Sequence, residues 1–370
     1  MPPMTDDIII PDGRFSRESF QHYLIENYHA LFLPGKKRKW IKIHGVRVKP
    51  DEWKDMLGRY LIRELGDVWH IGLPIFGNEQ PNGRERVDFY ICNYSPELLL
   101  FYTASTNWEY ERSLRKLTDE TLGLGRMWIG PKRFEDLVLH FMDRFNPTLE
   151  RFIARRTQRD TLDAKLRPEM DRRVNWTAMD SFDTLWELRD LYGVRPTSVV
   201  MRMHGGKIQL NNDGMFVITR ATRDMFAAFE DAMSLLKEEQ VSYARTSQKM
   251  ELVSQTIRTD AGEIVVPKLT SGTILLQKMK LDSAVIKKIE SSAKFDFVES
   301  SPVEGSFSWV STAIDKDKKS VFGINSNDTT INLVPRFNTT FESFLDFYRQ
   351  ILEEVDPTAK FQIFGGLIER

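Results

Sequence analysis

One arrangement of strand, polar turn, strand and helix occurs twice in the second half of this chain. In the first copy a β-strand pattern leads to Asp213, and the next strand ends at Arg220. In the second copy Asp328 and Arg336 take these places, 115 and 116 positions further along. Asn and Asp suit the turn between the strands because they tolerate positive φ and hydrogen-bond their own backbone. A repeat of this kind restricts the chain to folds that contain the same α+β unit twice.

The helices that follow the two turns also match. At the offset of 116 their apolar positions coincide, as in the pairs Met225 and Phe341, Phe229 and Leu345, and Leu236 and Leu352. We therefore predict a duplicated α+β domain over 176–370, with antiparallel sheets and repeats at about 176–245 and 282–356. Repeats of this size form a shared saddle or two separate lobes. The alternative is that the duplication only builds a larger scaffold.

The balance of charge limits how this protein can bind nucleic acid. The 370 residues carry a net charge of −1, so any attraction to phosphate must come from a local basic patch. This length also favours more than one domain. The single cysteine, Cys92, cannot form an internal disulfide, and the first residues lack the pattern of a signal peptide. We expect a cytoplasmic protein without a membrane partner.

The N-terminal segment 1–147 alternates helix and strand patterns and is predicted to be an α/β domain. Over 51–145 the predicted order is α-β-β-β-α-β-α, with one strand over 86–94. This order resembles the αβββαβ core of the restriction-endonuclease-like nucleases. The resemblance implies a metal-binding Asp on the second strand, where Asp88 lies, and an acid-x-Lys pair on the third. The third strand departs from that pattern, because no Lys stands two residues after Glu97.

Asp88 leaves three interpretations open. It is an ordinary strand residue, or a remnant in an inactive nuclease-like domain, or a metal ligand with Glu64, Glu109 or Lys116 replacing the missing pair. One carboxylate cannot bind a hard divalent cation on its own, since such ions need several oxygen ligands. We therefore assign no catalytic residue and expect neither a metal ion nor a cofactor.

A basic connector is predicted between the two domains, over 148–175. Its residues 149–167 follow a helical pattern, which places Arg151, Arg155 and Arg159 on one stripe. Such a stripe can contact phosphates, and each contact adds to a salt-sensitive affinity. The alternative is a solvated helix with ordinary i,i+4 ion pairs, such as Arg156 with Asp160 and Arg159 with Asp163.

The basic stretch over 36–49 contains one tryptophan and no acidic residue. We predict a β-hairpin here, with a turn near His44 and Gly45. Basic side chains around an aromatic ring can bind phosphates and stack on a base, whereas the alternative is a solvated hairpin edge. The nucleic-acid candidates in this stretch are Lys36, Lys37, Arg38, Lys39, Trp40 and Lys42.

These patterns together predict a mixed fold, α/β in the N-terminal domain and α+β in the C-terminal domain. No complete catalytic or cofactor motif is present. We therefore interpret the chain as a non-catalytic nucleic-acid-binding accessory subunit of a larger intracellular system. Its expected partners are DNA or RNA and another protein. Two alternatives stay open: a protein-interaction scaffold without nucleic-acid contact, and a metal-dependent nuclease with a displaced active site.

Overall fold

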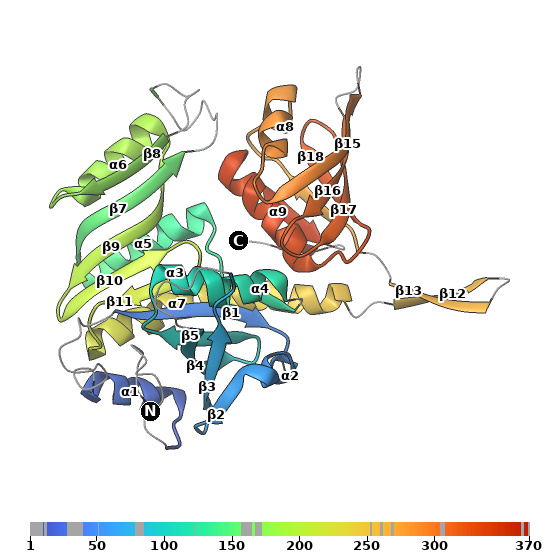
Figure 1. The fold of residues 1–370 in the computed structure, drawn as a ribbon. Helices are drawn as coiled ribbons and strands as arrows, with labels where there is room; N and C mark the ends of the chain where they lie inside the picture. The colour runs from blue at the N-terminus through green and yellow to red at the C-terminus, as the bar shows by residue number, and fades with distance from the viewer. Residues whose placement is uncertain are drawn as a thin grey trace.

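The described residues form two large antiparallel sheets, of eleven and seven strands, with helices on their faces (Figure 1). This mixed architecture confirms the predicted fold class. A hairpin of β12 (Ser254–Thr259) and β13 (Gly262–Pro267) projects away from both sheets. Within the described residues, no helix is both long and apolar enough to cross a membrane. The computed structural model describes residues 10, 13–27, 40–50, 52–77, 85–121, 123–156, 165–166, 172–251, 254–259, 262–267, 270–303, 308–363 and 366–368.

Strand β1 (Ile41–Val48) is the centre of the eleven-stranded sheet. All of its residues are buried, as expected for a strand covered on both faces. The predicted hairpin with a turn at His44 and Gly45 is therefore wrong. Gly45 lies in the middle of the strand. A Cβ at this position would come within 2.9 Å of the Met127 side chain, so the close packing requires glycine. The strands paired with β1 are β5 (Leu98–Thr103), β6 (Leu124–Arg126) and β11 (Met215–Ile218).

On one side of β1 the sheet continues as an antiparallel meander. From the edge inwards its strands are β2 (Leu61–Glu64), β3 (Val68–Pro74), β4 (Arg86–Ser95) and β5. The helices around it are α1 (Arg17–Asn27), α2 (Trp53–Leu57), α3 (Asn107–Tyr110) and α4 (Lys116–Glu120), with a π-helical turn η2 (Glu111–Arg115) between the last two and a 3-10 turn η1 (Gly58–Tyr60) after α2. Helix α1 packs on one face of the meander and the other helices pack on the opposite face, so both faces are buried.

On the other side of β1 lies a second half-sheet, whose strands all come after residue 147. The sheet therefore extends beyond the predicted N-terminal domain of residues 1–147. Outwards from β11 its strands are β10 (Gly206–Asn211), β9 (Arg195–Met203), β7 (Thr148–Arg156) and β8 (Arg172–Thr177). The helices that cover one of its faces are α5 (Pro131–Phe145), α6 (Ser181–Tyr192) and α7 (Arg223–Glu251). No described helix packs against the opposite face of this half-sheet.

The basic connector helix predicted over 148–175 is wrong, because the described part of this segment consists of the two strands β7 and β8. Phe152 and Ala154 are buried in alternation along β7, a period of two that the spacing of the arginines concealed. Arg151 and Arg155 still share a face, because residues four apart lie on the same side of both a helix and a strand. Arg159 lies outside the described residues.

The C-terminal sheet is closed on one face by two helices, α8 (Ser283–Glu290) and α9 (Phe341–Glu354). In spatial order its strands are β15 (Phe295–Val303), β16 (Ser308–Asp315), β17 (Ser320–Ser326), β18 (Thr330–Pro335), β14 (Gly272–Leu275), β19 (Lys360–Ile363) and β20 (Gly366–Ile368). The predicted repeat agrees with this structure. Strands β9 to β11 and β16 to β18 are both antiparallel meanders followed by a helix, α7 and α9 respectively.

A second equivalence, which the sequence did not indicate, relates the two ends of the chain. The N-terminal unit runs strand, helix, four-stranded meander, helix, strand, and the unit from β14 to β19 repeats this order. The first strand of each unit lies between the last strand of its meander and the final strand. Along the chain, the second half-sheet of β7 to β11 therefore lies between two units of the same topology.

The C-terminal sheet domain is joined to β1 by a buried ion pair. Arg47 of β1 donates from Nη2 to Oε2 of Glu342 on α9 at 2.6 Å, and the two side chains are 3% and 8% exposed. Nη1 of Arg47 donates to Gln240 of α7 at 2.9 Å. Gly125 leaves room for this contact, since a Cβ there would lie 2.3 Å from the Glu342 carboxylate. The pair thus ties together both sheets and the long helix α7.

Removing the charge of Glu342 should destabilise the protein strongly. In Glu342→Gln the guanidinium of Arg47 stays buried without a counter-charge, and breaking such a pair costs about 3–5 kcal/mol. Urea denaturation measures the free energy of unfolding. The matched control is Glu111→Gln, which removes the half-exposed pair with Arg115 and should cost less than about 1 kcal/mol. Equal losses in the two variants would contradict the assigned role.

Stability should also depend on the protonation of His44. Its ring is fully buried and stacks on Tyr110 with centroids 3.9 Å apart, and burial, Lys42 and Arg126 hold the pKa of His44 well below its usual range. The unfolded chain binds a proton on this histidine below about pH 6.5, whereas the folded protein does not. The free energy of unfolding should therefore fall as pH drops from about 7 to 5, by up to about 1.4 kcal/mol per pH unit. Urea titrations of wild type and His44→Phe should show a weaker dependence in the variant; identical slopes would refute this.

Candidate nucleic-acid interface

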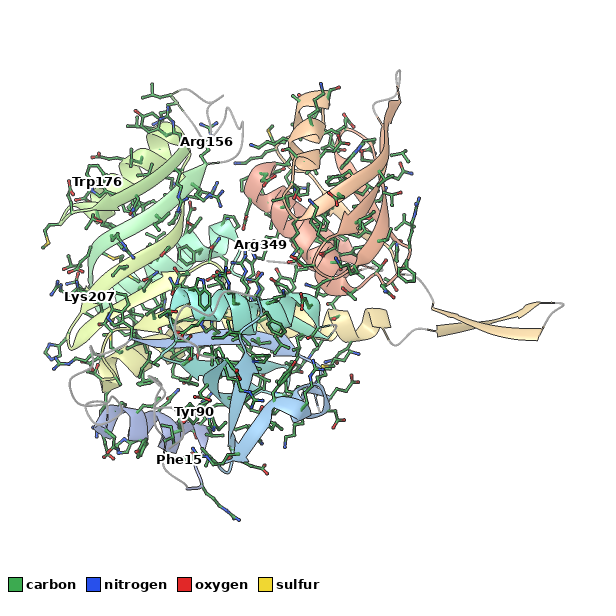
Figure 2. All side chains as sticks on the ribbon, in the orientation of Figure 1. Phe15, Tyr90, Arg156, Trp176, Lys207 and Arg349 are labelled. Carbon is green, nitrogen blue, oxygen red and sulfur yellow. The ribbon has the colours of Figure 1, made fainter. Side chains whose placement is uncertain are left out.

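The uncovered face of the second half-sheet is rich in basic and polar side chains. Alternate residues of a strand point to opposite faces, and a bulge between β7 and β9 at Ile153 and Ala154 shifts this alternation, so that Arg195 shares a face with Arg155. Phe152, Val199 and Ile208 point into the core shared with the covering helices. The opposite surface, called here the basic sheet face, is formed by Arg151, Ile153, Arg155, Arg173, Arg195, Thr197, Val200, Lys207 and Gln209. Figure 2 shows Lys207 towards one end of this half-sheet and Arg156 at the other.

Three arginines stand next to one another across the basic sheet face. Arg155 of β7 is paired in register with Arg173 of β8 on one side and with Arg195 of β9 on the other. Opposite residues on neighbouring strands have Cβ atoms about 4.5–5.5 Å apart, so like charges there repel. Nη1 of Arg195 pairs with Glu135 of α5 at 3.0 Å. No acidic group in the described part of the chain forms an ion pair with Arg155 or Arg173, and the row keeps positive charge that an anion can neutralise.

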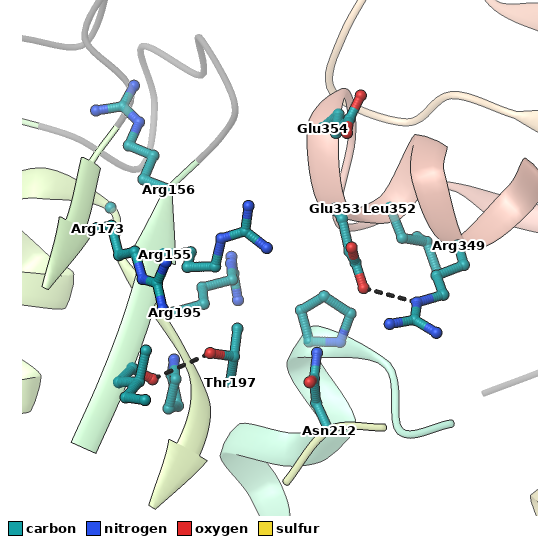
Figure 3. A pocket seen from close by; sticks show the side chains of 14 residues that line it. Arg155, Arg156, Arg173, Arg195, Thr197, Asn212, Arg349, Leu352, Glu353 and Glu354 are labelled. Atoms are coloured by element: carbon teal, nitrogen blue, oxygen red, sulfur yellow. Dashed lines mark hydrogen bonds and ion pairs between the residues drawn. The ribbon is translucent and has the colours of Figure 1, made fainter. Parts of the chain in front are cut away.

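Helix α9 faces this arginine row across a cleft of about 340 Å³ (Figure 3). Arg349 of α9 pairs with Glu353, with 2.9 Å between Nε and Oε1. Burial raises the pKa of Glu354 at the helix end, although a hydrogen bond from Gln350 and nearby cations oppose this. The side chains around the cleft include five arginines and two glutamates, so the lining is positive on balance. Such a lining favours an anion with several acceptor oxygens.

A second hollow, of about 370 Å³, lies on the same face beside Trp40. The Trp40 side chain is 51% exposed, and Arg151 also lines the hollow. Glu150 accepts hydrogen bonds from Lys207 and Arg202. Burial by itself raises the pKa of Glu150, but these hydrogen bonds outweigh burial and lower it. Arg151 forms no ion pair with an acidic group among the described residues, so the hollow combines an exposed aromatic ring with an available cation.

The structure separates the nucleic-acid candidates that the sequence suggested. Trp40 and Arg151 line the hollow, and Arg155 lines the cleft. Lys42 is buried in β1 and donates to the carbonyl oxygen of Ser105, so it is not part of the basic sheet face. The remaining candidates, Lys36, Lys37, Arg38, Lys39 and Arg159, lie outside the described residues.

The four residues considered for a nuclease site lie in separate local contacts. Asp88 on β4 lies 3.1 Å from Nε2 of His70 on β3. The other three also have neighbouring partners: Glu64 with the Trp69 indole, Glu109 with the Thr106 amide, and Lys116 with Glu120. Among the residues that the structure describes, no three His, Cys, Asp or Glu side chains are grouped as a metal site requires.

Three cations of the basic sheet face were not found from the sequence. Arg173 fell in a segment interpreted as a linker, and Arg195 and Lys207 belong to strands in the predicted repeat. They come together only through the pairing order β8-β7-β9-β10, which no local pattern encodes. The alternation of buried residues in β7 is the signal that would have identified its strand and thereby the face of Arg151 and Arg155.

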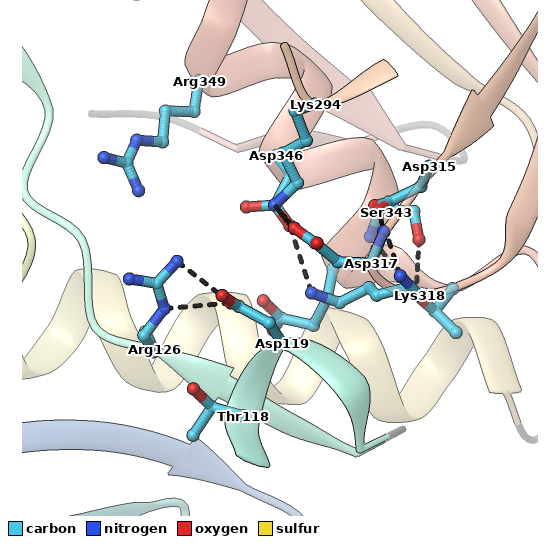
Figure 4. Close-up of polar contacts among 12 residues, drawn as sticks. Thr118, Asp119, Arg126, Lys294, Asp315, Asp317, Lys318, Ser343, Asp346 and Arg349 are labelled. Atoms are coloured by element: carbon cyan, nitrogen blue, oxygen red, sulfur yellow. Dashed lines mark hydrogen bonds and ion pairs between the residues drawn. The ribbon is translucent and has the colours of Figure 1, made fainter. Parts of the chain in front are cut away.

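A group of charged side chains lies next to the cleft, where α9 faces the N-terminal unit (Figure 4). Asp346 accepts from Lys294 at 2.7 Å and from Lys318 at 3.1 Å. Burial by itself raises the pKa of Asp346, but the two lysines outweigh burial and hold it far below its usual range. Arg126 of β6 pairs with Asp119 of α4 at 3.0 Å on the facing surface. The contacts of Asp346 with Lys294 and Lys318 hold the part of α9 that leads to Arg349 within the C-terminal domain.

Replacing Asp346 should weaken the protein in a pH-dependent way. In Asp346→Asn the Lys318 side chain, which is 4% exposed, loses its counter-charge, and such a loss costs about 3 kcal/mol or more. The lowered pKa means that Asp346 stabilises the folded state above about pH 3.9 and that this contribution disappears as pH falls. Urea denaturation of wild type and variant at about pH 7 and about pH 3.5 should show the difference shrinking at the lower pH. A constant difference would contradict the assignment.

The fold and the site define an α+β protein with an arginine-lined cleft between two sheets. No family model matches this chain, and no curated protein matches it in sequence. The functional argument therefore rests on the geometry and charge of the basic sheet face and the cleft.

Proposed function

We propose that this protein is a non-catalytic nucleic-acid-binding accessory subunit that holds a single strand on the basic sheet face. The row of Arg155, Arg173 and Arg195 carries the proposal. Like charges opposite one another on neighbouring strands destabilise a sheet. Proteins break such local rules mainly at functional sites, where a ligand compensates for the loss. Arginine guanidinium groups bind phosphate, as they bind carboxylate, through bidentate hydrogen bonds.

The cations of this face are spread along the strands and are not gathered at one position. Arg151 and Arg155 lie on the same strand four residues apart, which is about 13 Å at about 3.3 Å per residue. Lys207 on β10 adds a further cation to this face and also contacts Glu150. A polyanion with regularly spaced phosphates can contact Arg151 and Arg155 at the same time, and each contact releases counterions. A near-neutral protein can therefore still bind nucleic acid at this surface.

The exposed ring of Trp40 favours a single strand over a duplex. Base stacking on an aromatic side chain requires an unpaired base and contributes about 1–3 kcal/mol with little sequence preference. Trp40 lies in the same hollow as Arg151, so a strand can stack one base while its phosphate contacts the guanidinium.

A protein-interaction scaffold is the second candidate. Val298, Val310 and Val334 are 45%, 43% and 44% exposed and lie on the face of the C-terminal sheet opposite its core. Exposed apolar side chains gathered on one face are typical of protein contacts. In an accessory subunit this face and the basic sheet face would serve different partners.

Binding of a fluorescent oligonucleotide of about 16 nucleotides tests the proposal. Single-stranded DNA should bind more tightly than the duplex. The double variant Arg155→Gln, Arg173→Gln should flatten the plot of log affinity against log salt by up to about 1.4, or about 0.7 for each lost contact. Trp40→Ala should weaken binding by about 1–3 kcal/mol without changing that slope.

The control removes two other exposed arginines, in Arg14→Gln, Arg59→Gln, and changes the net charge equally. Its salt slope should match that of wild type. Absence of binding at low salt, or an equal effect of both double variants, would leave the scaffold as the better explanation. Strand cleavage with Mg²⁺ or Mn²⁺ that disappears in Asp88→Ala would instead establish the nuclease alternative.

A further inference from the structure

The cleft between the arginine row and α9 concentrates more positive charge than a phosphodiester needs. Five arginines and two glutamates give its lining a net formal charge of +3, whereas Arg151, Lys207 and Glu150 give the hollow beside Trp40 a net formal charge of +1. Each phosphodiester of a strand carries one negative charge. A terminal phosphomonoester carries about −1.5 to −2 charges at neutral pH and has three strong acceptor oxygens. The cleft therefore fits the charge of a strand end better than that of an internal phosphate.

The walls of the cleft also suit the end of a strand. Strands β7, β8 and β9 form one wall and α9 forms the other, while Pro131 and Asn212 line the space between them. Pro131 is the first residue of α5, a 15-residue helix whose N-cap Gly130 makes no side-chain hydrogen bond. The positive end of the α5 helix dipole therefore lies at the cleft. A strand that follows the sheet face from Trp40 meets these walls.

We infer that the cleft binds the terminal phosphate of the strand whose following nucleotides lie along the basic sheet face. This inference rests on the proposed function. Arg155 and Arg173 contact the phosphate from the sheet, and Arg349 contacts it from α9. Among the described residues, only Nε of Arg349 is hydrogen-bonded, to Glu353, so its two terminal nitrogens can form a bidentate contact. The bound phosphate then joins the second half-sheet to the C-terminal domain.

Competition binding with three versions of one single-stranded oligonucleotide tests this inference: 5′-phosphorylated, 3′-phosphorylated and without a terminal phosphate. One phosphorylated version should bind about tenfold more tightly than the unphosphorylated one. Arg349→Gln should remove this preference and weaken binding of the phosphorylated strand far more than binding of the unphosphorylated strand. Glu353→Gln should increase the preference, because it removes a negative charge from the cleft and releases Nε of Arg349. AMP and inorganic phosphate serve as free competitors.

The outcomes separate this inference from the proposed function. Equal affinity for all three oligonucleotides would overturn the terminal-phosphate site and leave strand binding intact. AMP that competes as well as the phosphorylated strand would overturn it in favour of a free mononucleotide. Failure of every oligonucleotide to bind would overturn the proposed function itself. Because Arg349→Gln and Glu353→Gln should shift the preference in opposite directions, a common loss of folding cannot imitate the expected result.

Discussion

The arrangement of this protein depends on the buried ion pair between Arg47 and Glu342. One partner lies on the central strand of the large sheet and the other lies in the first turn of α9, so neither sheet can move without exposing or separating the charges. The pair fixes the start of a helix whose last turn lines the cleft. Glu342 and Glu353 are eleven positions apart, or about 16 Å along the helix axis. A rigid helix of this length places Arg349 and Glu353 opposite the arginine row.

The electrostatics of the basic sheet face follow from the way acidic residues are distributed. The whole chain is almost neutral, yet the described glutamates near this face pair with only some of its cations. Glu135 binds Arg195 and Arg189, and Glu150 binds Lys207 and Arg202. In the described part of the chain no acidic group forms an ion pair with the guanidinium groups of Arg151, Arg155 and Arg173. Local pairing, rather than overall composition, therefore decides where an anion is attracted.

The sequence predicted the repeated meander and helix well, because turn chemistry and apolar spacing are local properties. It failed at β1 and β7 for two physical reasons. β1 alternates apolar and polar residues on either side of Gly45, a pattern typical of two half-exposed strands, so β1 was taken for a hairpin around Gly45 although all of its residues are buried. Arginines four residues apart fit a helix and a strand equally, so β7 was taken for a helix. The equivalence between the N-terminal and C-terminal units left no residue pattern and became visible only in the order of the strands.

By itself the sequence determined a mixed α and β architecture, a repeated unit in the second half and the need for a local basic patch. It also placed Trp40, Arg151 and Arg155 among the ligand candidates. Only the tertiary structure decided which cations meet. Arg155, Arg195 and Arg349 belong to two strands and a helix that are far apart along the chain, and strand pairing and the burial of Arg47 against Glu342 bring them to one cleft. Such contacts depend on the packing free energy of the whole chain, which no short stretch of sequence contains.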